Sequence, residues 1–437
     1  MTTPPAPSSP AEGEGQGEGA NAEAAPRHDS PPHPGPLLAK GERESPLIFL
    51  VAGEPSGDAL GAALIRGLKQ RAGGAVRFAG IGGEEMAKEG VESLVPLHEL
   101  AIMGVAEVLP RARAILRRVR ETVEEVVRLQ PAAVVTIDSS GFSWRIAERL
   151  RRRGERLPLV HYVAPMVWAW RAGRARRMAR WYDLLLVLLP FEPPYFTRVG
   201  LACAYVGHPV IESGADRGDR AGFRARHAVP PEAPLLCVLP GSRRGEVTRL
   251  LPVFRDTVER IAAATPGLRV VVPTVANVAH LVRAGTAEWS LPVLVVAGTA
   301  EKYDAFAAAD AALAASGTVA LELAMARLPM VVAYRANPVT AWLVRRVVKV
   351  PYANLVNLVL GRGVVPELLQ DDCTAERLSS AVIELLRGSE ARARQRAGFA
   401  EALAQLGSGG TSPSLRAADE VLALIARSGS ARLSEEE

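Results

Sequence analysis

The sequence has few cysteines, no long hydrophobic run and no leader-like N-terminus. Its three cysteines, Cys203, Cys237 and Cys373, lack metal-binding or redox spacing, which fits a reducing compartment and argues against a disulfide framework. No stretch has the length and low charge of a membrane span, and the apolar run Leu184–Leu189 has the length of a core strand. No basic region precedes an apolar one at the N-terminus, so no secretory signal is expected.

Several catalytic signatures are also missing. The chain contains no G-x-S-x-G elbow, no H-E-x-x-H motif and no cluster of metal ligands, so no metal site is expected. Its net charge of +5 comes from arginines spread over several expected helices. Because these arginines do not form a basic stripe interleaved with aromatic residues, no nucleic-acid partner is predicted.

The two ends of the chain differ in composition from the rest. Residues 1–45 are rich in Pro, Gly, Ala and Glu and poor in large apolar side chains, and the Ser-Glu-Glu-Glu end at 428–437 is similarly polar. Such segments bury too little surface to offset the entropy lost on ordering, so both are predicted to be disordered.

Between these ends, short apolar runs alternate with helical patterns, and the pattern restarts after the charged stretch Glu212–Arg226. Apolar runs without strict alternation are typical of parallel strands buried on both faces. The length beyond the tail also suits two domains better than one. We therefore expect an α/β chain with two successive parallel sheets. The expected strands are Leu47–Ala52, Ala75–Ala79, Ala132–Ile137, Leu157–Val163, Leu184–Leu189, Ala202–Val206, Leu235–Leu239, Arg269–Val272, Val293–Val296, Ala311–Ala314 and Met330–Ala333.

The loop Pro240–Glu246 follows one of these strands and precedes a helix expected near Val247. Glycine lets the backbone approach a ligand, a helix N-terminus presents free N–H groups, and Arg243 adds a cationic fork suited to phosphate. A solvated surface loop explains the same residues, and the loop alone favours a phosphate site only slightly.

Polar clusters follow other strands, where ligands of open parallel sheets bind. The loop Gly53–Asp58 could bind a ligand or only cap a helix, with equal weight. Asp138 could be a general base, although capping of the next helix explains it better from sequence alone. In the second half, Ser316–Thr318 precede a helix carrying Glu322, which is either a ligand contact or a solvated carboxylate.

Two further features of the first half have competing interpretations. The tryptophans that flank Ala169 in Val167–Arg171 more often complete a core than form a wall for a ligand. His161 lies inside an expected strand and fits a core histidine better than a catalyst. Gly207–Pro209 stands where the chain would cross between domains, so a hinge competes with a ligand contact.

Short motifs run through both halves of the chain. They are VAGEPSGD (Val51–Asp58), AIMG (Ala101–Gly104), EVLP (Glu107–Pro110), Ile137 with Asp138, HYV (His161–Val163), VWAWR (Val167–Arg171), LPFEP (Leu189–Pro193), VGHP (Val206–Pro209), LPGSR (Leu239–Arg243), SGT (Ser316–Thr318) with Glu322, PMVVAYR (Pro329–Arg335) and VPELLQ (Val365–Gln370). In this order, from about Leu47 to Ile425, they resemble the lipid-A-disaccharide synthase family.

The resemblance implies a GT-B fold, with two Rossmann-like domains whose parallel sheets face across a cleft. Residues 46–211 would form the acceptor- and membrane-facing domain, residues 212–400 would bind the UDP-sugar, and helices in 401–427 would pack back on the first domain. The implied enzyme is an inverting hexosyltransferase. It transfers 2,3-diacylglucosamine from UDP-2,3-diacylglucosamine to 2,3-diacylglucosamine 1-phosphate, forming a β(1→6) disaccharide and UDP without a cofactor.

The resemblance also implies roles for single residues. Asp138 would be the base and Arg243 would stabilise the leaving diphosphate, with Asn357 orienting the donor or acceptor. The remaining implied substrate- or nucleotide-binding residues are Glu54, Ser56, Gly57, Asp58, Trp168, Arg171, Gly241, Ser242, Ser316, Gly317, Thr318 and Glu322. The resemblance also implies that the enzyme binds the anionic surface of the inner membrane on its cytoplasmic face. Whether it forms a homodimer is left open.

The sequence departs from the family pattern in two places. Where the family has S-P-S-V-W-A-W-R, this sequence has Ala164 and Met166 in place of the two serines. Where the family has P-N-L-L-A-G-R-E, this sequence has Val356 in place of the proline and Gly363 in place of the glutamate. Three alternatives stay open at this point: a cell-wall glycosyltransferase, a UDP-N-acetylglucosamine epimerase, or a non-catalytic nucleotide-sugar-binding protein.

Acylated substrates would require a membrane-docking surface. In Ile102–Leu109 the apolar residues precede a cluster of arginines that would attract anionic headgroups, so this patch is the predicted docking face. Farther on, Ile115, Val119, Val123, Val126 and Val127 recur at helical spacing and fit a core better.

Overall fold

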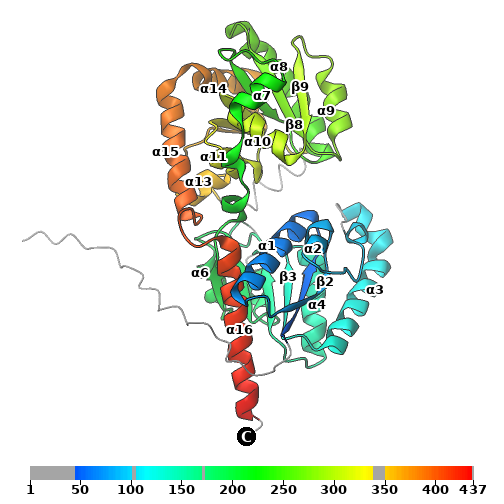
Figure 1. Cartoon of the computed structure of the whole chain (residues 1–437). Helices are drawn as coiled ribbons and strands as arrows, with labels where there is room; N and C mark the ends of the chain where they lie inside the picture. The colour runs from blue at the N-terminus through cyan, green and yellow to red at the C-terminus, as the bar shows by residue number, and fades with distance from the viewer. Residues whose placement is uncertain (1–44, 101–104, 170–172, 338–349, 436–437) are drawn as a thin grey trace, which may run out of the picture. The chain divides into compact units, whose positions relative to one another are not determined.

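Strands and helices alternate along the chain, as the sequence predicts. The computed structural model describes residues 45–100, 105–169, 173–337 and 350–435. Within these ranges the strands form two six-stranded sheets, one built from the first half of the chain and one from the second (Figure 1). The α/β class with two parallel sheets is therefore confirmed.

The first sheet has the strand order β2-β1-β3-β4-β5-β6, and every neighbouring pair is parallel. Its strands are β1 (Leu47–Ala52), β2 (Arg77–Ile81), β3 (Ala133–Ile137), β4 (Leu159–Tyr162), β5 (Leu184–Val187) and β6 (Cys203–Tyr205). The helices between and after them are α1 (Pro55–Arg71), α2 (Glu84–Lys88), α3 (Val105–Leu129), α4 (Ser140–Arg152), α5 (Gly173–Met178) and α6 (Pro193–Thr197), with a 3-10 turn at η1 (Leu97–Glu99).

The second sheet has the order β12-β11-β10-β7-β8-β9 and is also parallel throughout. Its strands are β7 (Leu235–Leu239), β8 (Arg269–Thr274), β9 (Val293–Ala297), β10 (Ala311–Ala315), β11 (Met330–Tyr334) and β12 (Glu367–Leu369). Its helices are α7 (Arg220–Arg226), α8 (Arg244–Ala264), α9 (Ala279–Thr286), α10 (Thr299–Ala308), α11 (Val319–Met325), α13 (Leu355–Leu360), α14 (Ala375–Arg387) and α15 (Ser389–Gln405), with 3-10 turns at η2 (Pro209–Glu212), η3 (Ala215–Arg217) and η4 (Gln370–Asp372).

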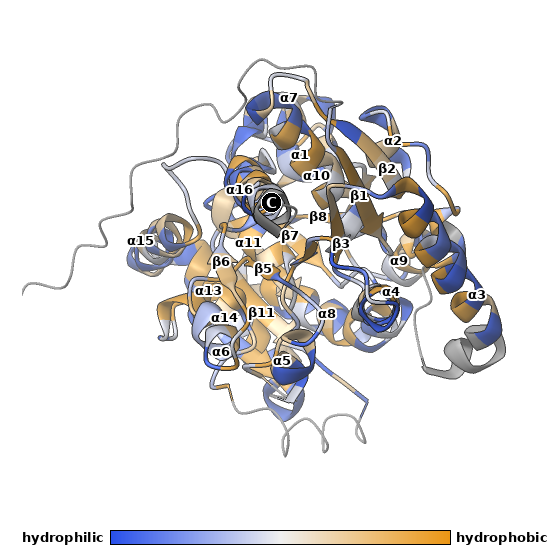
Figure 2. Cartoon of the chain, turned by 90° about the horizontal axis from the view of Figure 1, so that it is seen from below, coloured by the Kyte–Doolittle hydropathy of each residue, from blue (hydrophilic) through white to orange (hydrophobic). Residues whose placement is uncertain are grey.

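Burial on both faces explains why the strands are apolar without alternation. Phe49 and Val51 of β1 belong to one hydrophobic cluster, whereas Ile48 and Leu50 belong to the cluster on the opposite face. Figure 2 shows the strands mainly in the hydrophobic colour, while helices such as α3 alternate between the two colours. The apolar stripe predicted for α3 packs in the first of these clusters, with Val119, Val123 and Val126 buried.

The expected strands are all present, with ends shifted by up to two residues. The expected run Leu184–Leu189 stops at Val187, and Ala75–Ala79 is displaced to Arg77–Ile81. Strand β12 was not predicted, because three residues at a sheet edge give too short an apolar run.

The C-terminal helix α16 (Pro413–Glu435) packs against α1, which covers the first sheet (Figure 1). Arg71 of α1 forms an ion pair of 2.8 Å with Asp419 of α16. A Cβ on Gly67 would lie 2.7 Å from the carbonyl oxygen of Ser414, so glycine allows this close approach. The domain limits at 211 and 400 stay predictions.

Register aligns the strand ends that carry the polar loops. Ala52 of β1 pairs with Ile137 of β3, and Ile137 pairs with Tyr162 of β4. In the second sheet, Ala314 of β10 pairs with Leu239 of β7. Because the strands are parallel, the loops that follow these residues meet at the carboxyl edge of their own sheet.

Candidate active site

Asp138 lies in a strained turn between β3 and α4. Its φ is +49° and that of Ser139 is +44°, a left-handed pair that non-glycine residues rarely adopt. The Asp138 N–H donates to the carbonyl of Tyr162 at 2.9 Å, and Ser143 Oγ donates to the Asp138 carbonyl at 2.9 Å. The N-cap of α4 is Ser139, so capping does not explain Asp138.

Glu54 and Asp138 follow adjacent strands and influence one another. Burial raises the pKa of the Asp138 carboxyl, against the lowering effect of the Ser139 N–H. The pKa of Glu54 is also raised, first by burial and then by the charge of Asp138, with Arg243 acting in the opposite direction. A carboxylate with a raised pKa is a better proton acceptor than an exposed one.

In the loop Gly53–Asp58, one residue has a clear structural role. Asp58 is buried, and its carboxylate accepts hydrogen bonds from the N–H groups of Gly83, Glu85 and Met86 at 2.7–3.0 Å. These contacts tie α1 to the start of α2, so a direct substrate contact by Asp58 stays a prediction. Ser56 is exposed and Gly57 is buried, with a Cβ position 3.4 Å from the carbonyl oxygen of Ile137.

In the second sheet, the loop after β7 folds around Glu246. Gly241 has φ +113°, and a Cβ there would lie 2.7 Å from Glu246. One Glu246 oxygen accepts from the N–H groups of Ser242 at 3.1 Å and Arg243 at 3.3 Å, and the other pairs with the Arg243 guanidinium at 3.1 Å. The Arg243 side chain is 67% exposed, so most of its donors face solvent.

Asn277 supports the same loop from the segment after β8. Its side-chain amide donates to the carbonyl of Ser242 at 2.9 Å. Sequence reasoning missed Asn277, for which no local signal exists. It also missed the carboxylate of Glu246 as a loop partner, although the spacing of Glu246 from Arg243 is that of a capping glutamate.

The β10–α11 turn presents Ser316, Gly317 and Thr318. The Ser316 N–H donates to the carbonyl of Ala333 at 2.9 Å, and a Cβ on Gly317 would meet nothing within 4 Å. The space next to the Gly317 backbone is therefore open, and Thr318 is the N-cap residue of α11.

Glu322 is not a solvated carboxylate, so that interpretation is wrong. Lys302 Nζ donates to both of its oxygens at 2.9 Å, and the Tyr303 hydroxyl donates to one at 3.2 Å. Both members of the Lys302–Glu322 ion pair are about three-quarters buried. Lys302 was not predicted, because it lies on α10 rather than on the motif-bearing helix.

Asn357 is buried, and both the oxygen and the NH₂ group of its side chain form hydrogen bonds within the protein. Its Nδ2 donates to the carbonyl of Val365 at 2.8 Å and to Glu367 at 2.6 Å, while its Oδ1 accepts from the N–H groups of Val364 and Val365. These bonds fix the turn between α13 and β12. A direct contact with donor or acceptor stays a prediction.

Trp168 follows β4, next to the strand that carries Asp138. Its ring is half-buried, and its indole N–H donates to Glu192 at 3.1 Å. Phe191 meets the same ring edge-on at 5.3 Å between centroids. Arg171, predicted beside Trp168, lies outside the described residues.

Two histidines near these strands are buried and neutral. His161 Nδ1 lies 2.8 Å from Thr136 Oγ1, and burial lowers the pKa of His161 to about 3, as expected of a core histidine. His208 Nδ1 accepts from the Val210 N–H at 3.1 Å, and burial lowers its pKa to about 4. The His208 N–H donates to the carbonyl of Leu406, so this segment touches the chain before α16.

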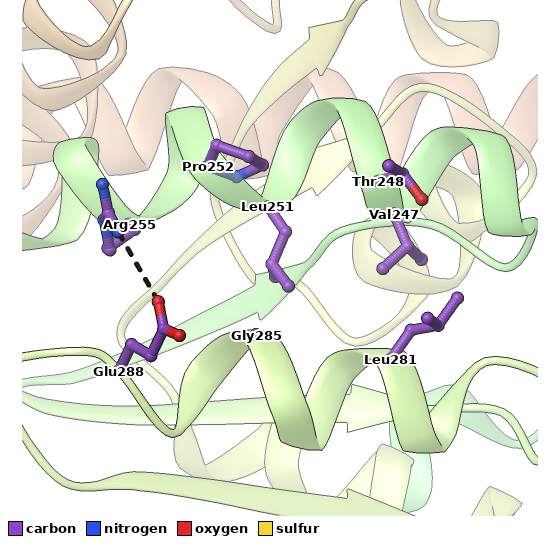
Figure 3. A pocket seen from close by; sticks show the side chains of 8 residues that line it. All are labelled: Val247, Thr248, Leu251, Pro252, Arg255, Leu281, Gly285 and Glu288. Carbon is purple, nitrogen blue, oxygen red and sulfur yellow. Dashed lines mark ion pairs between the residues drawn. The ribbon is translucent and has the colours of Figure 1, made fainter.

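A groove of about 250 Å³ between α8 and α9 is separate from these residues (Figure 3). Leu251 points toward Gly285, and a Cβ on Gly285 would lie 2.2 Å from the Leu251 side chain. An ion pair of 4.0 Å joins Arg255 to Glu288. Its lining residues are Val247, Thr248, Leu251, Pro252, Arg255, Leu281, Gly285 and Glu288, none of which is a predicted site residue. The groove is therefore a feature of helix packing.

The proposed docking patch Ile102–Leu109 lies outside the residues whose side chains the structure describes. Among the described residues, no helix has both the length and the apolar character needed to cross a membrane. Within the same ranges, no three His, Cys, Asp or Glu side chains gather as a potential metal site.

Comparison with known proteins decides the family. A family model described as lipid-A-disaccharide synthetase matches residues 48–418. The chain belongs to the lipid-A-disaccharide synthase family. The lipid-A-disaccharide synthase of Rhodospirillum centenum is 55% identical over 87% of this chain and 95% of its own length. That of Paramagnetospirillum magneticum is 54% identical over 87% of this chain and 97% of its own length.

Solved structures with low sequence identity share the fold. A Staphylococcus aureus MnaA–UDP structure has a TM-score of 0.59 at 12% identity, and covers 86% of this chain and 95% of its own. The kitacinnamycin glycotransferase has a TM-score of 0.58 at 18% identity, over 88% of this chain and the whole of its own. These neighbours support the GT-B-like arrangement of two parallel sheets. Membership of the lipid-A-disaccharide synthase family makes the chain a glycosyltransferase, rather than the epimerase, cell-wall enzyme or binding protein left open by its residues.

Proposed function

We propose that this enzyme transfers 2,3-diacylglucosamine from UDP-2,3-diacylglucosamine to the 6-hydroxyl of 2,3-diacylglucosamine 1-phosphate. The acceptor oxygen forms a bond to the anomeric carbon as the bond from that carbon to the UDP oxygen breaks. One direct displacement inverts the configuration and gives the β(1→6) disaccharide 1-phosphate and UDP. The identity of the substrates rests on the family. The assignment of Asp138 as the base rests on its position and surroundings, which follow.

The observation that carries the mechanism is the partly buried carboxylate of Asp138 at the carboxyl end of β3. Its raised pKa and its fixed turn suit a group that takes the proton of the acceptor hydroxyl. Glu54, which follows the neighbouring strand β1, also has a raised pKa, first because of its burial and then because of the charge of Asp138. Trp168, in the loop after the neighbouring strand β4, would contact the acceptor sugar.

The leaving diphosphate would bind at the loop after β7. Negative charge grows on UDP in the transition state, and the exposed donors of Arg243 with the N–H groups of Ser242 and Arg243 would stabilise it. Glu246 now accepts from those N–H groups, so the diphosphate would compete with it for them. Ser316–Thr318 would hold the nucleotide, and Glu322, oriented by Lys302, would accept hydrogen bonds from the ribose.

We further propose that residues 46–211 bind the acceptor and residues 212–400 the UDP-sugar. The enzyme would work at the cytoplasmic face of the inner membrane, bound to anionic lipid through Ile102–Leu109. A homodimer is compatible with this arrangement. No cofactor is part of the proposal.

A UDP-release assay tests the proposed function. Donor and acceptor are each supplied in acylated and deacylated form, and the product linkage is determined by NMR spectroscopy. We expect rapid UDP release only when both substrates are acylated, with a β(1→6) product. Equal turnover of deacylated substrates, or UDP release without an acceptor, would contradict the proposal.

A further inference from the structure

Glu192 is a buried carboxylate that joins two loops at the carboxyl edge of the first sheet. It is 3% exposed and precedes α6, after β5. One of its oxygens accepts from the indole N–H of Trp168 at 3.1 Å, and the other accepts from the N–H groups of Leu188 at 3.2 Å and Leu189 at 3.0 Å. Glu192 therefore connects the loop after β4 to the end of β5.

The donors around Glu192 explain why a carboxylate occupies this position. Three N–H groups approach it, shared between its two oxygens, and a carboxylate can accept hydrogen bonds at both oxygens without presenting a donor. No Lys, Arg or His among the described residues forms an ion pair with it, and the thiol of Cys203 on β6 is a further neighbour. Burial raises the pKa of Glu192 to about 7, so the site keeps a carboxylate at an energetic cost that Leu, Met or Gln would avoid.

Trp168 is the half-buried end of this arrangement. Phe191 meets the ring edge-on, Glu192 accepts its N–H, and the half-buried side chain packs against the hydrophobic cluster that contains Leu189. Because β4 neighbours β3, the loop that carries Trp168 and the turn that carries Asp138 follow adjacent strands at the carboxyl edge of the first sheet. An indole at this edge of the sheet suits the apolar face of a pyranose.

We propose that Glu192 is a positioning residue for the acceptor, which sets the orientation of the Trp168 ring through its indole N–H and thereby determines how the acceptor glucosamine is held for reaction at Asp138. The inference rests on the proposed function. The acceptor is the relevant substrate because the Trp168 loop follows a strand of the first sheet, as the Asp138 turn does, whereas the loops assigned to UDP follow strands of the second sheet.

Glutamine at position 192 separates this role from simple support of the loop. Its one carbonyl oxygen can still accept from Leu188 and Leu189, but its NH₂ group then faces the indole N–H, so only the bond to Trp168 is lost. Trp168→Phe removes the same bond from the other side and keeps an aromatic ring. Trp289→Phe is the matched control, since Trp289 is a buried tryptophan in the second sheet's core whose indole N–H has no partner among the described residues.

The experiment measures kcat, the KM for acylated acceptor and the Kd for UDP in the parent, Glu192→Gln, Trp168→Phe, their double variant and Trp289→Phe. We expect each of the first two to raise the acceptor KM about 10-fold, the size of a lost hydrogen bond to a charged group, with the UDP Kd unchanged. In the Trp168→Phe background, Glu192→Gln should add nothing, because the bond it removes is already absent. Trp289→Phe should leave the acceptor KM unchanged.

Several outcomes would overturn the inference. One is an equal effect of Glu192→Gln in both backgrounds, which would mean that Glu192 acts only through Leu188 and Leu189. Another is an unchanged acceptor KM, or a UDP Kd that moves with it. If circular dichroism shows that Glu192→Gln does not fold, the test is the acceptor KM of Trp168→Phe compared with that of Trp289→Phe. A parent enzyme without activity on acylated substrates would instead reject the proposed function.

Discussion

Ser139 occupies the space that a side chain on Gly53 would need. A Cβ at position 53 would lie 2.4 Å from Ser139 Oγ and 2.6 Å from Ser139 Cβ. Gly53 follows β1 and Ser139 follows β3, so this contact locks together the two turns that carry Glu54 and Asp138. The glycine in the Gly53–Asp58 loop is required for the shape of the base's turn as much as for any ligand.

The contact predicts that Gly53→Ala is destabilising and that Ser139→Gly rescues it. The added methyl group should lower the free energy of unfolding by roughly 1–3 kcal/mol, as overpacking does, and reduce turnover by moving Asp138. Glycine at 139 removes both clashing atoms and suits the positive φ there. Urea unfolding and kcat of the two single variants and the double variant check this, and a double variant no better than Gly53→Ala would contradict it.

Asp138→Asn should lose turnover while keeping the fold and UDP affinity. An amide cannot take the acceptor proton, and loss of a general base typically costs about two to four powers of ten in rate. The amide can still occupy the same volume, so thermal unfolding and UDP binding by calorimetry should match the parent. Near-normal turnover of purified Asp138→Asn would show that the base is another residue.

The pH dependence of the rate should show the raised pKa of Asp138. A base must be deprotonated to act, and burial raises this pKa above the ordinary 3.8, so kcat/KM should fall on acidification at a pH above that value. Asp138→Asn should lack this acid limb in its residual activity. The measurement is a pH–rate profile on both proteins, and an identical limb in the variant would assign it to a different group.

Arg243→Ala should weaken UDP-sugar binding or turnover without unfolding the chain. The side chain is 67% exposed and pairs with Glu246 among the described residues, so its removal should cost little stability. Charge on the diphosphate is assigned to Arg243 and backbone N–H groups, so the parent should stay active in excess chelator. Activity abolished by chelator and restored by Mg²⁺ would count against this assignment.

The docking patch predicts that Met103→Ser or Val105→Ser weakens binding to anionic vesicles. Removing apolar contact should lower the bound fraction in a vesicle sedimentation assay, and added salt should lower it further in the parent. Bulk stability should change little. As a control, Val119→Ser, which alters the buried stripe of α3, should reduce stability instead. Unchanged vesicle binding and acceptor turnover in the first two variants would place the docking face elsewhere.

The sequence by itself determined the sheets, the loops that carry the polar clusters and the family. Strand length, apolar runs and motif spacing are local properties of the chain, so β1, β7 and β10 and the loops after them could be predicted from consecutive residues. The position of Asp138 at the end of β3 was visible in the same way. Its turn was not, because two adjacent left-handed residues carry no signal without glycine.

Only the tertiary structure decided which side chains meet. Glu192 and Trp168 are 24 residues apart, Lys302 and Glu322 are 20 apart, and Asn277 and Ser242 are 35 apart. Each pair comes from different loops or helices, which parallel strands bring to the same edge of a sheet. Side-chain partners of this kind depend on strand order and register, and those are set by the packing of the whole sheet rather than by any segment of it.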